Sequence, residues 1–184
     1  LNALERLVLR EDCRERIAAI LEPLYRQNDW WQKLVIILDA RLQYVDDPAE
    51  RRSMLREIAQ IHETRGGDQT LALRALARAW KDDIRDEEVY DELSALVAKL
   101  SAWNDLIEVM EAGIADTYDY DQAAVVLARM GEIHENQRGD IGAAIAAWNR
   151  LLEVKDDDAR ALTELDRLYE FEERWAEQVK MIKR

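Results

Sequence analysis

Two histidines, His62 and His134, are the residues of this chain best suited to acid–base chemistry or metal binding, and each is followed by a glutamate. An imidazole beside a carboxylate can hold a metal ion or move a proton near neutral pH. The two histidines lie 72 residues apart, a spacing that recurs throughout the sequence. Residues at equivalent places in separate repeats do not converge on one ion or substrate, so we expect both histidines to serve packing.

Other catalytic patterns are missing from the sequence. It has no glycine-rich phosphate loop, no nucleophile motif and no paired metal ligands on one helix face. Acidic stretches at residues 82–88, 116–121 and 156–158 lack the alternating ligands and central glycine of an EF-hand calcium loop. We expect these stretches to be solvated loops and helix starts, and we predict no enzymatic activity, no metal and no cofactor.

Charge and cysteine content narrow the possible partners. The formal net charge of −13 disfavours nucleic acid and anionic lipid, and it favours a basic protein surface. The lone Cys13 cannot form an internal disulfide, which excludes a disulfide-stapled secreted scaffold and leaves the compartment open. The apolar runs, such as residues 34–38, fall far short of the roughly 18 residues that a membrane span requires.

An internal repeat of 72 residues organises the sequence. Tryptophan recurs with this period at Trp31, Trp103 and Trp175. Two leucine tracks keep the same register, at Leu21, Leu93 and Leu165 and at Leu24, Leu96 and Leu168. The offset also relates His62-Glu63 to His134-Glu135 and Gly67-Asp68 to Gly139-Asp140. Self-similarity at a fixed period is the signature of a repeat architecture.

Each repeat is expected to fold into four helices, which in the first repeat span residues 14–27, 31–44, 48–65 and 68–82. Apolar residues recur there at intervals of three and four residues, as in Leu34, Ile37, Leu38 and Leu42. Gly66-Gly67 and Arg138-Gly139 predict left-handed helix ends, and Asp68 and Asp140 predict the following caps. Pro23 is expected to bend or interrupt the first helix near Ala19.

This pattern resembles the tetratricopeptide repeat (TPR) family, whose unit is a helical hairpin of roughly 34 residues with small residues at the helix crossing. The family's large, small, aromatic, small and aromatic positions hold Leu55-Ala59-His62-Ala72-Leu76 and Leu127-Gly131-His134-Ala144-Trp148. Glu22, Ser94 and Asp166 depart from the pattern because they replace a small residue. The resemblance implies an all-α, right-handed superhelix of antiparallel hairpins with about 11 helices, a solenoid without strands.

The repeat also predicts how the chain is divided. Double repeats are expected at residues 14–85 and 86–157, with residues 1–13 ending a preceding repeat and residues 158–184 beginning a third. Both ends of the sequence fall inside the pattern, so we expect the repeats to continue in both directions.

Tryptophans at the repeated position, Trp31, Trp103 and Trp175, are expected to close each hairpin within the core, because they fill the same space each time. Trp30 differs, since Ala102 and Arg174 occupy its equivalent positions. It is therefore the best candidate for an exposed aromatic residue in an interface.

The resemblance further implies a concave surface lined by the first helix of each hairpin. Outward positions on these helices, together with Trp30, form a partner-binding row of mixed charge: Arg16, Arg26, Gln27, Arg56, Gln60, Glu63, Thr64, Asp91, Lys99, Glu132, Glu135, Asn136, Arg160, Thr163, Arg167 and Phe171. Some family members hold the C-terminal carboxylate of heat-shock chaperones with a set of Lys, Asn and Arg. The corresponding positions here hold Ala19, Pro23, Asp91, Ala95, Thr163 and Arg167, which disfavours that role.

The sequence thus favours a protein-interaction scaffold that binds a partner peptide or helix in a concave groove. Two alternatives stay open. One is a structural segment that self-assembles into a homo-oligomer through hairpin edges or the convex face. The other is a regulatory arm of a larger enzyme or transport machine.

Overall fold

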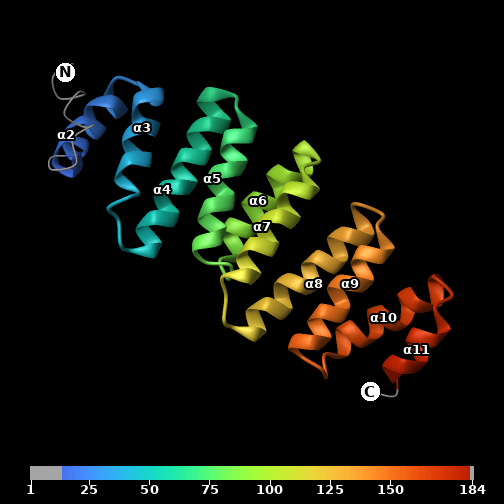
Figure 1. The fold of residues 1–184 in the computed structure, drawn as a ribbon. Helices are drawn as coiled ribbons and strands as arrows, with labels where there is room; N and C mark the ends of the chain where they lie inside the picture. Colours follow the sequence, from blue (N-terminus) through green and yellow to red (C-terminus); the bar gives the residue numbers. More distant parts are fainter. Residues whose placement is uncertain (1–13, 183–184) are drawn as a thin grey trace. The chain divides into compact units, whose positions relative to one another are not determined.

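The computed structural model describes residues 14–182, which form ten α-helices, one π-helical turn and no β-strand (Figure 1). The chain divides after Leu100 into two compact units. The all-α class predicted from the sequence is confirmed. The helix expected at the start of the sequence and Cys13 lie outside the described residues.

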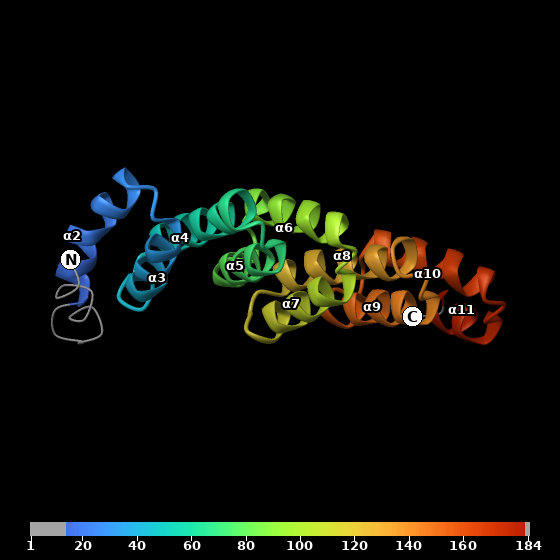
Figure 2. The ribbon, with the colours of Figure 1, turned by 90° about the horizontal axis from the view of Figure 1, so that it is seen from above.

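The described part of unit 1 contains five α-helices that pack mainly on their neighbours in the chain. The hairpins are α2 with α3 and α4 with α5, and α6 packs on α5. The bounds are α2 (Arg14–Gln27), α3 (Trp31–Arg41), α4 (Pro48–Ile61), α5 (Gln69–Asp82) and α6 (Glu87–Leu100), with a π-helical turn (His62–Gly66) after α4. Seen from above, α4 and α6 lie in one layer and α3 and α5 in the other (Figure 2).

Unit 2 repeats this arrangement. The closest pair is α8 with α9, and α10 packs on both α9 and α11. The bounds are α7 (Trp103–Ala115), α8 (Tyr120–Asn136), α9 (Ile141–Val154), α10 (Ala159–Phe171) and α11 (Trp175–Ile182). Within this unit α8 and α10 share one layer, and α9 and α11 share the other (Figure 2).

Helix caps explain several of these bounds. Gly67 and Gly139 have φ of 62° and 63°, a left-handed conformation that glycine adopts at no steric cost. Asp68 then accepts a hydrogen bond from the backbone N–H of Leu71, and Asp140 accepts one from Ala143. The predicted helix ends and caps are therefore confirmed at both places.

Three expectations about helix extent need correction. The helix predicted to run to Tyr44 ends at Arg41, because residues 42–44 form a turn before Asp47 caps α4. The helix predicted to run to residue 65 changes from α to π geometry at His62. Pro23 does not interrupt α2, which continues to Gln27. Its costs there are one missing backbone hydrogen bond and crowding of its ring against the carbonyl of Ala19, four residues earlier.

Helix crossings are close where the residues are small, as in a TPR-like hairpin. A Cβ added to Gly131 of α8 would lie 2.5 Å from the Trp148 ring of α9. In the α4–α5 hairpin, the equivalent small residues Ala59 of α4 and Ala72 of α5 are both buried. The chain therefore has the TPR-like helical repeat fold that its sequence resembles.

The tryptophan track behaves differently from the expectation. Trp31 and Trp103 are only partly buried, and Trp175 is 53% exposed. The fully buried tryptophans are Trp80 and Trp148, on α5 and α9. Leucine is the better guide to the core, since Leu21, Leu93 and Leu165 are all completely buried.

Ion pairs also follow the 72-residue period. Arg78 of α5 contacts Asp39 of α3 at 2.9 Å, and the equivalent Arg150 of α9 contacts Glu111 of α7 through Nη2 and Oε2 at 2.9 Å. Both partners in unit 2 occupy the positions of their counterparts in unit 1. The second helices of neighbouring hairpins are thus joined by the same contact in each unit.

Candidate functional site

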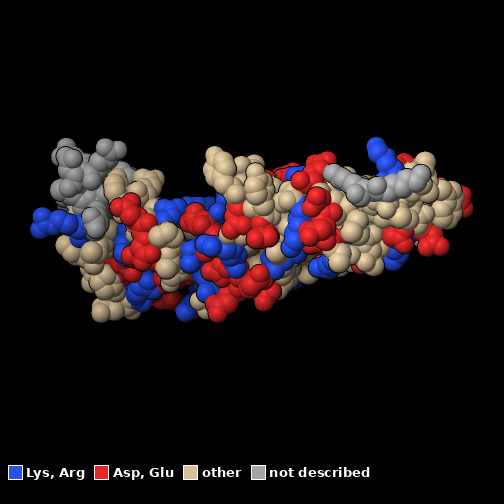
Figure 3. Space-filling view, turned by 90° about the horizontal axis from the view of Figure 1, so that it is seen from below, with Lys and Arg blue, Asp and Glu red and all other residues tan. Residues whose placement is uncertain are grey.

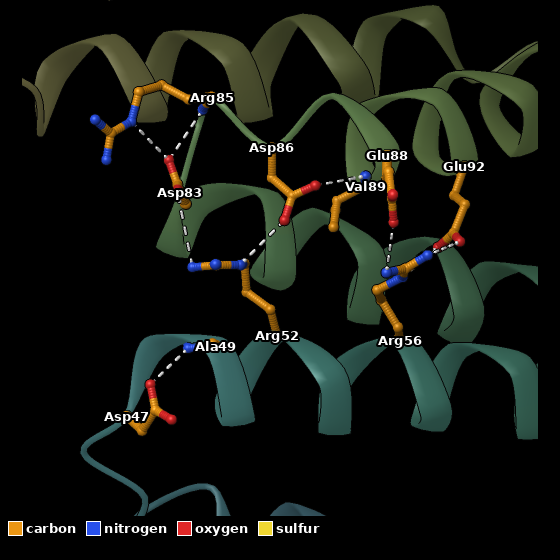
Figure 4. Close-up of polar contacts among 10 residues, drawn as sticks. All are labelled: Asp47, Ala49, Arg52, Arg56, Asp83, Arg85, Asp86, Glu88, Val89 and Glu92. Carbon is orange, nitrogen blue, oxygen red and sulfur yellow. Dashed lines mark hydrogen bonds and ion pairs between the residues drawn. The ribbon is translucent and has the colours of Figure 1, made fainter.

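Two arginines on α4 join this helix to α6 and to the loop before it (Figure 4). Arg52 approaches Asp86 at 3.1 Å and Asp83 at 3.6 Å. One turn further on, Arg56 contacts Glu92 at 2.6 Å and Glu88 at 3.2 Å. Asp86 also accepts the backbone N–H of Val89 as the cap of α6. Each arginine therefore bridges two carboxylates across the gap between the helices.

Other basic residues continue these contacts along the same layer of unit 1. Arg26 of α2 bonds both Glu22 of its own helix and Glu57 of α4. Lys99 near the end of α6 contacts Glu63 in the π-helical turn at 3.1 Å. The first helices α2, α4 and α6 are thus held together by charged side chains.

The charges of these groups are stabilised by their contacts. Hydrogen bonds to Glu92 raise the pKa of Arg56 above its ordinary value despite partial burial. Partial burial acts to raise the pKa of Glu22, but hydrogen bonds from Arg26 and Arg41 outweigh it and leave that pKa below its ordinary value. Glu22 and Arg56 consequently stay ionised at neutral pH.

A groove lies between α4 and α6, with α5 beneath it. Its volume is about 810 Å³, within the range of small-molecule and peptide side-chain sites. The residues that line it are Ser53, Arg56, Glu57, Ala59, Gln60, Glu63, Ala72, Leu76, Glu92, Ala95, Leu96 and Lys99. Its floor is aliphatic, from Ala59, Ala72, Leu76 and Leu96, and its walls carry the charged residues just described.

In unit 2, glutamates of α8 pair with arginines of α10. Arg160 bonds Glu132, and Arg167 contacts Glu135 at 2.6 Å and Glu164 at 2.7 Å. The Arg160 guanidinium also lies 5.5 Å from the centre of the Trp148 ring.

On the face in Figure 3, basic and acidic side chains are interspersed and do not separate into large patches of one sign.

The predicted partner-binding row divides into three groups. Arg56, Gln60, Glu63 and Lys99 line the groove of unit 1, and Arg26 bonds Glu57 in its wall. Glu132, Glu135, Arg160 and Arg167 meet as ion pairs in unit 2. The remainder do not line this groove: Arg16, Gln27, Thr64, Asp91, Asn136, Thr163 and Phe171 are exposed positions on or near their helices.

Trp30 lies in the turn before α3, with 38% of its surface exposed. Its ring centroid is 5.9 Å from that of Tyr25, and the Lys33 ammonium lies 5.1 Å above it. It does not line the groove. Since Tyr25 belongs to α2 and Lys33 to α3, both contacts lie within the α2–α3 hairpin.

Several groove residues were missed by the sequence reasoning, chiefly Glu57, Glu92 and Ala95. Glu92 was the easiest to find, because it lies 36 residues after Arg56, one hairpin length, and has the opposite charge. Ala95 carried a different signal. It appeared only as a position that lacks a chaperone-binding residue, although a small side chain there leaves the groove open.

The histidines do not form a shared site. His134 is buried, and its Nδ1 lies 2.7 Å from Nη1 of Arg138. Burial lowers the pKa of His134 and Arg138 adds to this effect, while Asp140 and Glu111 act in the opposite direction.

Among residues 14–182, no group of three or more histidine, cysteine or carboxylate side chains is placed to hold a metal ion. Nor is any helix in this range both long and apolar enough to cross a membrane.

Comparison with known proteins gives structural similarities alone. No family model matches the chain, and no curated protein matches its sequence. A crystal structure of MamA has 18% identity and a TM-score of 0.46, covering 88% of this chain and 90% of that one. A putative kinesin light chain with nearly identical TPR-like repeats from Podosopora anserina has 14% identity and a TM-score of 0.44, covering 95% and 94%. Because these TM-scores lie below 0.5, the fold assignment rests on the hairpins of this chain.

Proposed function

We propose that this chain is a protein-interaction scaffold and that the groove between α4 and α6 holds a short segment of a partner polypeptide. The observation that carries this proposal is the groove itself, where an aliphatic floor lies between walls of charged side chains. An aliphatic floor gives affinity by burying an apolar side chain, and charged walls give orientation and selectivity.

The arrangement offers less to a chemical reaction. The charged groups of the groove are paired with one another, and hydrogen bonds hold the pKa of Arg56 further from neutrality than that of a free arginine. A general acid or base works best with a pKa near the operating pH. A binding role without catalysis therefore accounts best for these residues.

Site-specific photocrosslinking in the source organism tests the proposal. A photoreactive amino acid replaces Ala95, which is exposed in the groove, and a matched variant carries it at Ile36 of α3, which is 65% exposed and lies outside the groove. We expect a discrete adduct with another polypeptide from position 95 and none from position 36. Equal labelling from both positions, or none from position 95, would remove the groove from the proposal.

A further inference from the structure

The groove of unit 1 holds more carboxylates than cations. Its lining includes three carboxylates, Glu57, Glu63 and Glu92, and two cations, Arg56 and Lys99. Arg56 is shared by Glu88 and Glu92, and one guanidinium balances the charge of only one carboxylate, so this cluster stays negative. Glu57 pairs with Arg26, which also contacts Glu22. Lys99 with Glu63 is balanced and does not compensate for the excess. The side chain of Glu88 is 79% exposed, so it remains open to a cation from outside.

The floor of the groove is made of small aliphatic groups. Ala59 and Ala72 are buried, and Ala95 lies exposed on the α6 wall. Leu76 and Leu96 complete this surface, and both are largely buried. Methyl groups of this kind contact an aliphatic side chain without offering it a hydrogen bond, so they favour an apolar anchor in the ligand.

We propose that the groove binds a basic segment of a partner protein in which an aliphatic residue lies between lysine or arginine residues. This inference rests on the proposed function and names the chemistry of the partner. The aliphatic side chain contacts Ala59, Ala72 and Ala95. The basic groups on either side pair with Glu57 and with Glu88 or Glu92.

Existing contacts explain why a basic segment is preferred to an acidic one. A ligand cation joins the second carboxylate of the Arg56 cluster, and Arg56 keeps its other partner. An acidic ligand would have to displace Glu88 or Glu92 from Arg56 and would then face the remaining carboxylate. Like charges placed together in an interface exclude the wrong partner.

Fluorescence anisotropy with three labelled peptides tests this inference on the full chain. The peptides share a central leucine and differ only in the flanking residues, which are lysine, glutamine or glutamate. We expect the lysine peptide to bind tightest and its affinity to fall as salt rises. Ala95→Trp fills the groove and should abolish this binding, while circular dichroism shows that the helices are retained.

Charge variants provide the sharper comparison. The double variant Glu88→Gln with Glu92→Gln leaves Arg56 without its two carboxylates. It should weaken the lysine peptide about two- to fivefold, as expected for an exposed ion pair, and make the glutamate peptide the better ligand. The control Glu108→Gln with Glu153→Gln removes the same charge from exposed positions of unit 2 and should keep the order of the wild type.

The possible outcomes separate the two proposals. Loss of lysine-peptide binding in Ala95→Trp, with a reversed order in the glutamine double variant, supports the inference. Tighter binding of the neutral or acidic peptide by the wild type, or no binding of any peptide, overturns it. If the adduct at position 95 persists in that case, the groove still binds protein, and if the adduct is also missing, the proposed function fails as well.

Discussion

Individual side chains decide how closely the helices of each hairpin approach. Gly131 lies against the face of Trp148, and a Cβ there would come within 2.5–3.0 Å of three ring atoms. Trp148 is 1% exposed and has no space into which it can move freely. A single hydrogen atom in place of a methyl group thus sets the crossing of α8 and α9.

Gly131→Ala should therefore destabilise the protein by about 1–3 kcal/mol, the usual cost of inserting a methyl group into a packed core. Gly142→Ala is the matched control. It also lies in a helix, but its Cβ would meet only Asp140 Oδ1, at 3.7 Å. That variant should be neutral or stabilising by up to about 1 kcal/mol, as is usual for glycine in a helix. Urea unfolding measures both, and equal effects would contradict the tight crossing.

The buried histidine predicts how stability depends on pH. Because burial lowers the pKa of His134, the folded chain resists a proton that the unfolded chain accepts near the ordinary value of 6.5. Stability from this residue is present above that pH and is lost as the pH falls through it. Arg138 opposes protonation, whereas Asp140 and Glu111 favour it.

The melting temperature should therefore decrease as the pH is lowered from about 7.5 to about 5.5, the range in which histidine titrates. His134→Phe should flatten this dependence. His62→Phe keeps His134 and should preserve it, which makes it the control. An unchanged slope in His134→Phe would assign the pH dependence to other groups.

At the scale of elements, local chemistry made the helices predictable. Gly67 and Asp68 set a helix end and a cap through backbone geometry that depends on adjacent residues only. The expected range 14–27 matches α2, and the expected range 68–82 differs from α5 by one residue. Burial of the tryptophan track was not predictable in this way. Trp31 lies against Gly66, about 3.4 Å from the position of an added Cβ, and the repeat pattern does not reveal such a neighbour.

The groove needed information that periodicity does not contain. The sequence placed Arg56, Gln60, Glu63 and Lys99 on one surface, and the structure brings them to one groove. Their ion pairs were not predicted, because the partners belong to other helices. Neighbouring helices in fact supply opposite charges 28–39 residues away in the chain.

Contacts between second helices can be tested by exchanging charges. Arg150→Glu should destabilise unit 2 by about 0.5–1 kcal/mol, because it replaces a partly exposed ion pair by two facing carboxylates. Adding Glu111→Arg should recover most of this loss. The equivalent single variant Arg78→Glu should cost less, since the side chains of Arg78 and Asp39 are more exposed, at 53% and 46%. Chemical unfolding of all four charge states gives the coupling energy, and a double variant no better than the single would refute the pairing.

At the scale of the whole molecule, the backbone conformation of one turn also repeats every 72 residues. Asp29, Ser101 and Glu173 are spaced by this period and have φ of 53°, 54° and 55°. None of the three residues is glycine, so each pays a steric cost for left-handed backbone geometry. The cost is smallest for aspartate. The repeat thus preserves a turn whose conformation suits glycine, although the residue type changes at every copy.

Glycine at these three turns should therefore stabilise the chain. Ser101→Gly and Glu173→Gly should each contribute about 0.5–1 kcal/mol, because relief of the left-handed strain exceeds the added freedom of the unfolded chain. Asp29→Gly should contribute least. Since the sites are 72 residues apart in sequence and share no hydrogen-bond partner, the gains in the triple variant should add. Asn104→Gly, an exposed helical position beside one of the turns, is the control and should destabilise slightly, by about 0.3 kcal/mol. Thermal and urea unfolding would check these values, and a loss of stability in Glu173→Gly would show that its backbone is not strained.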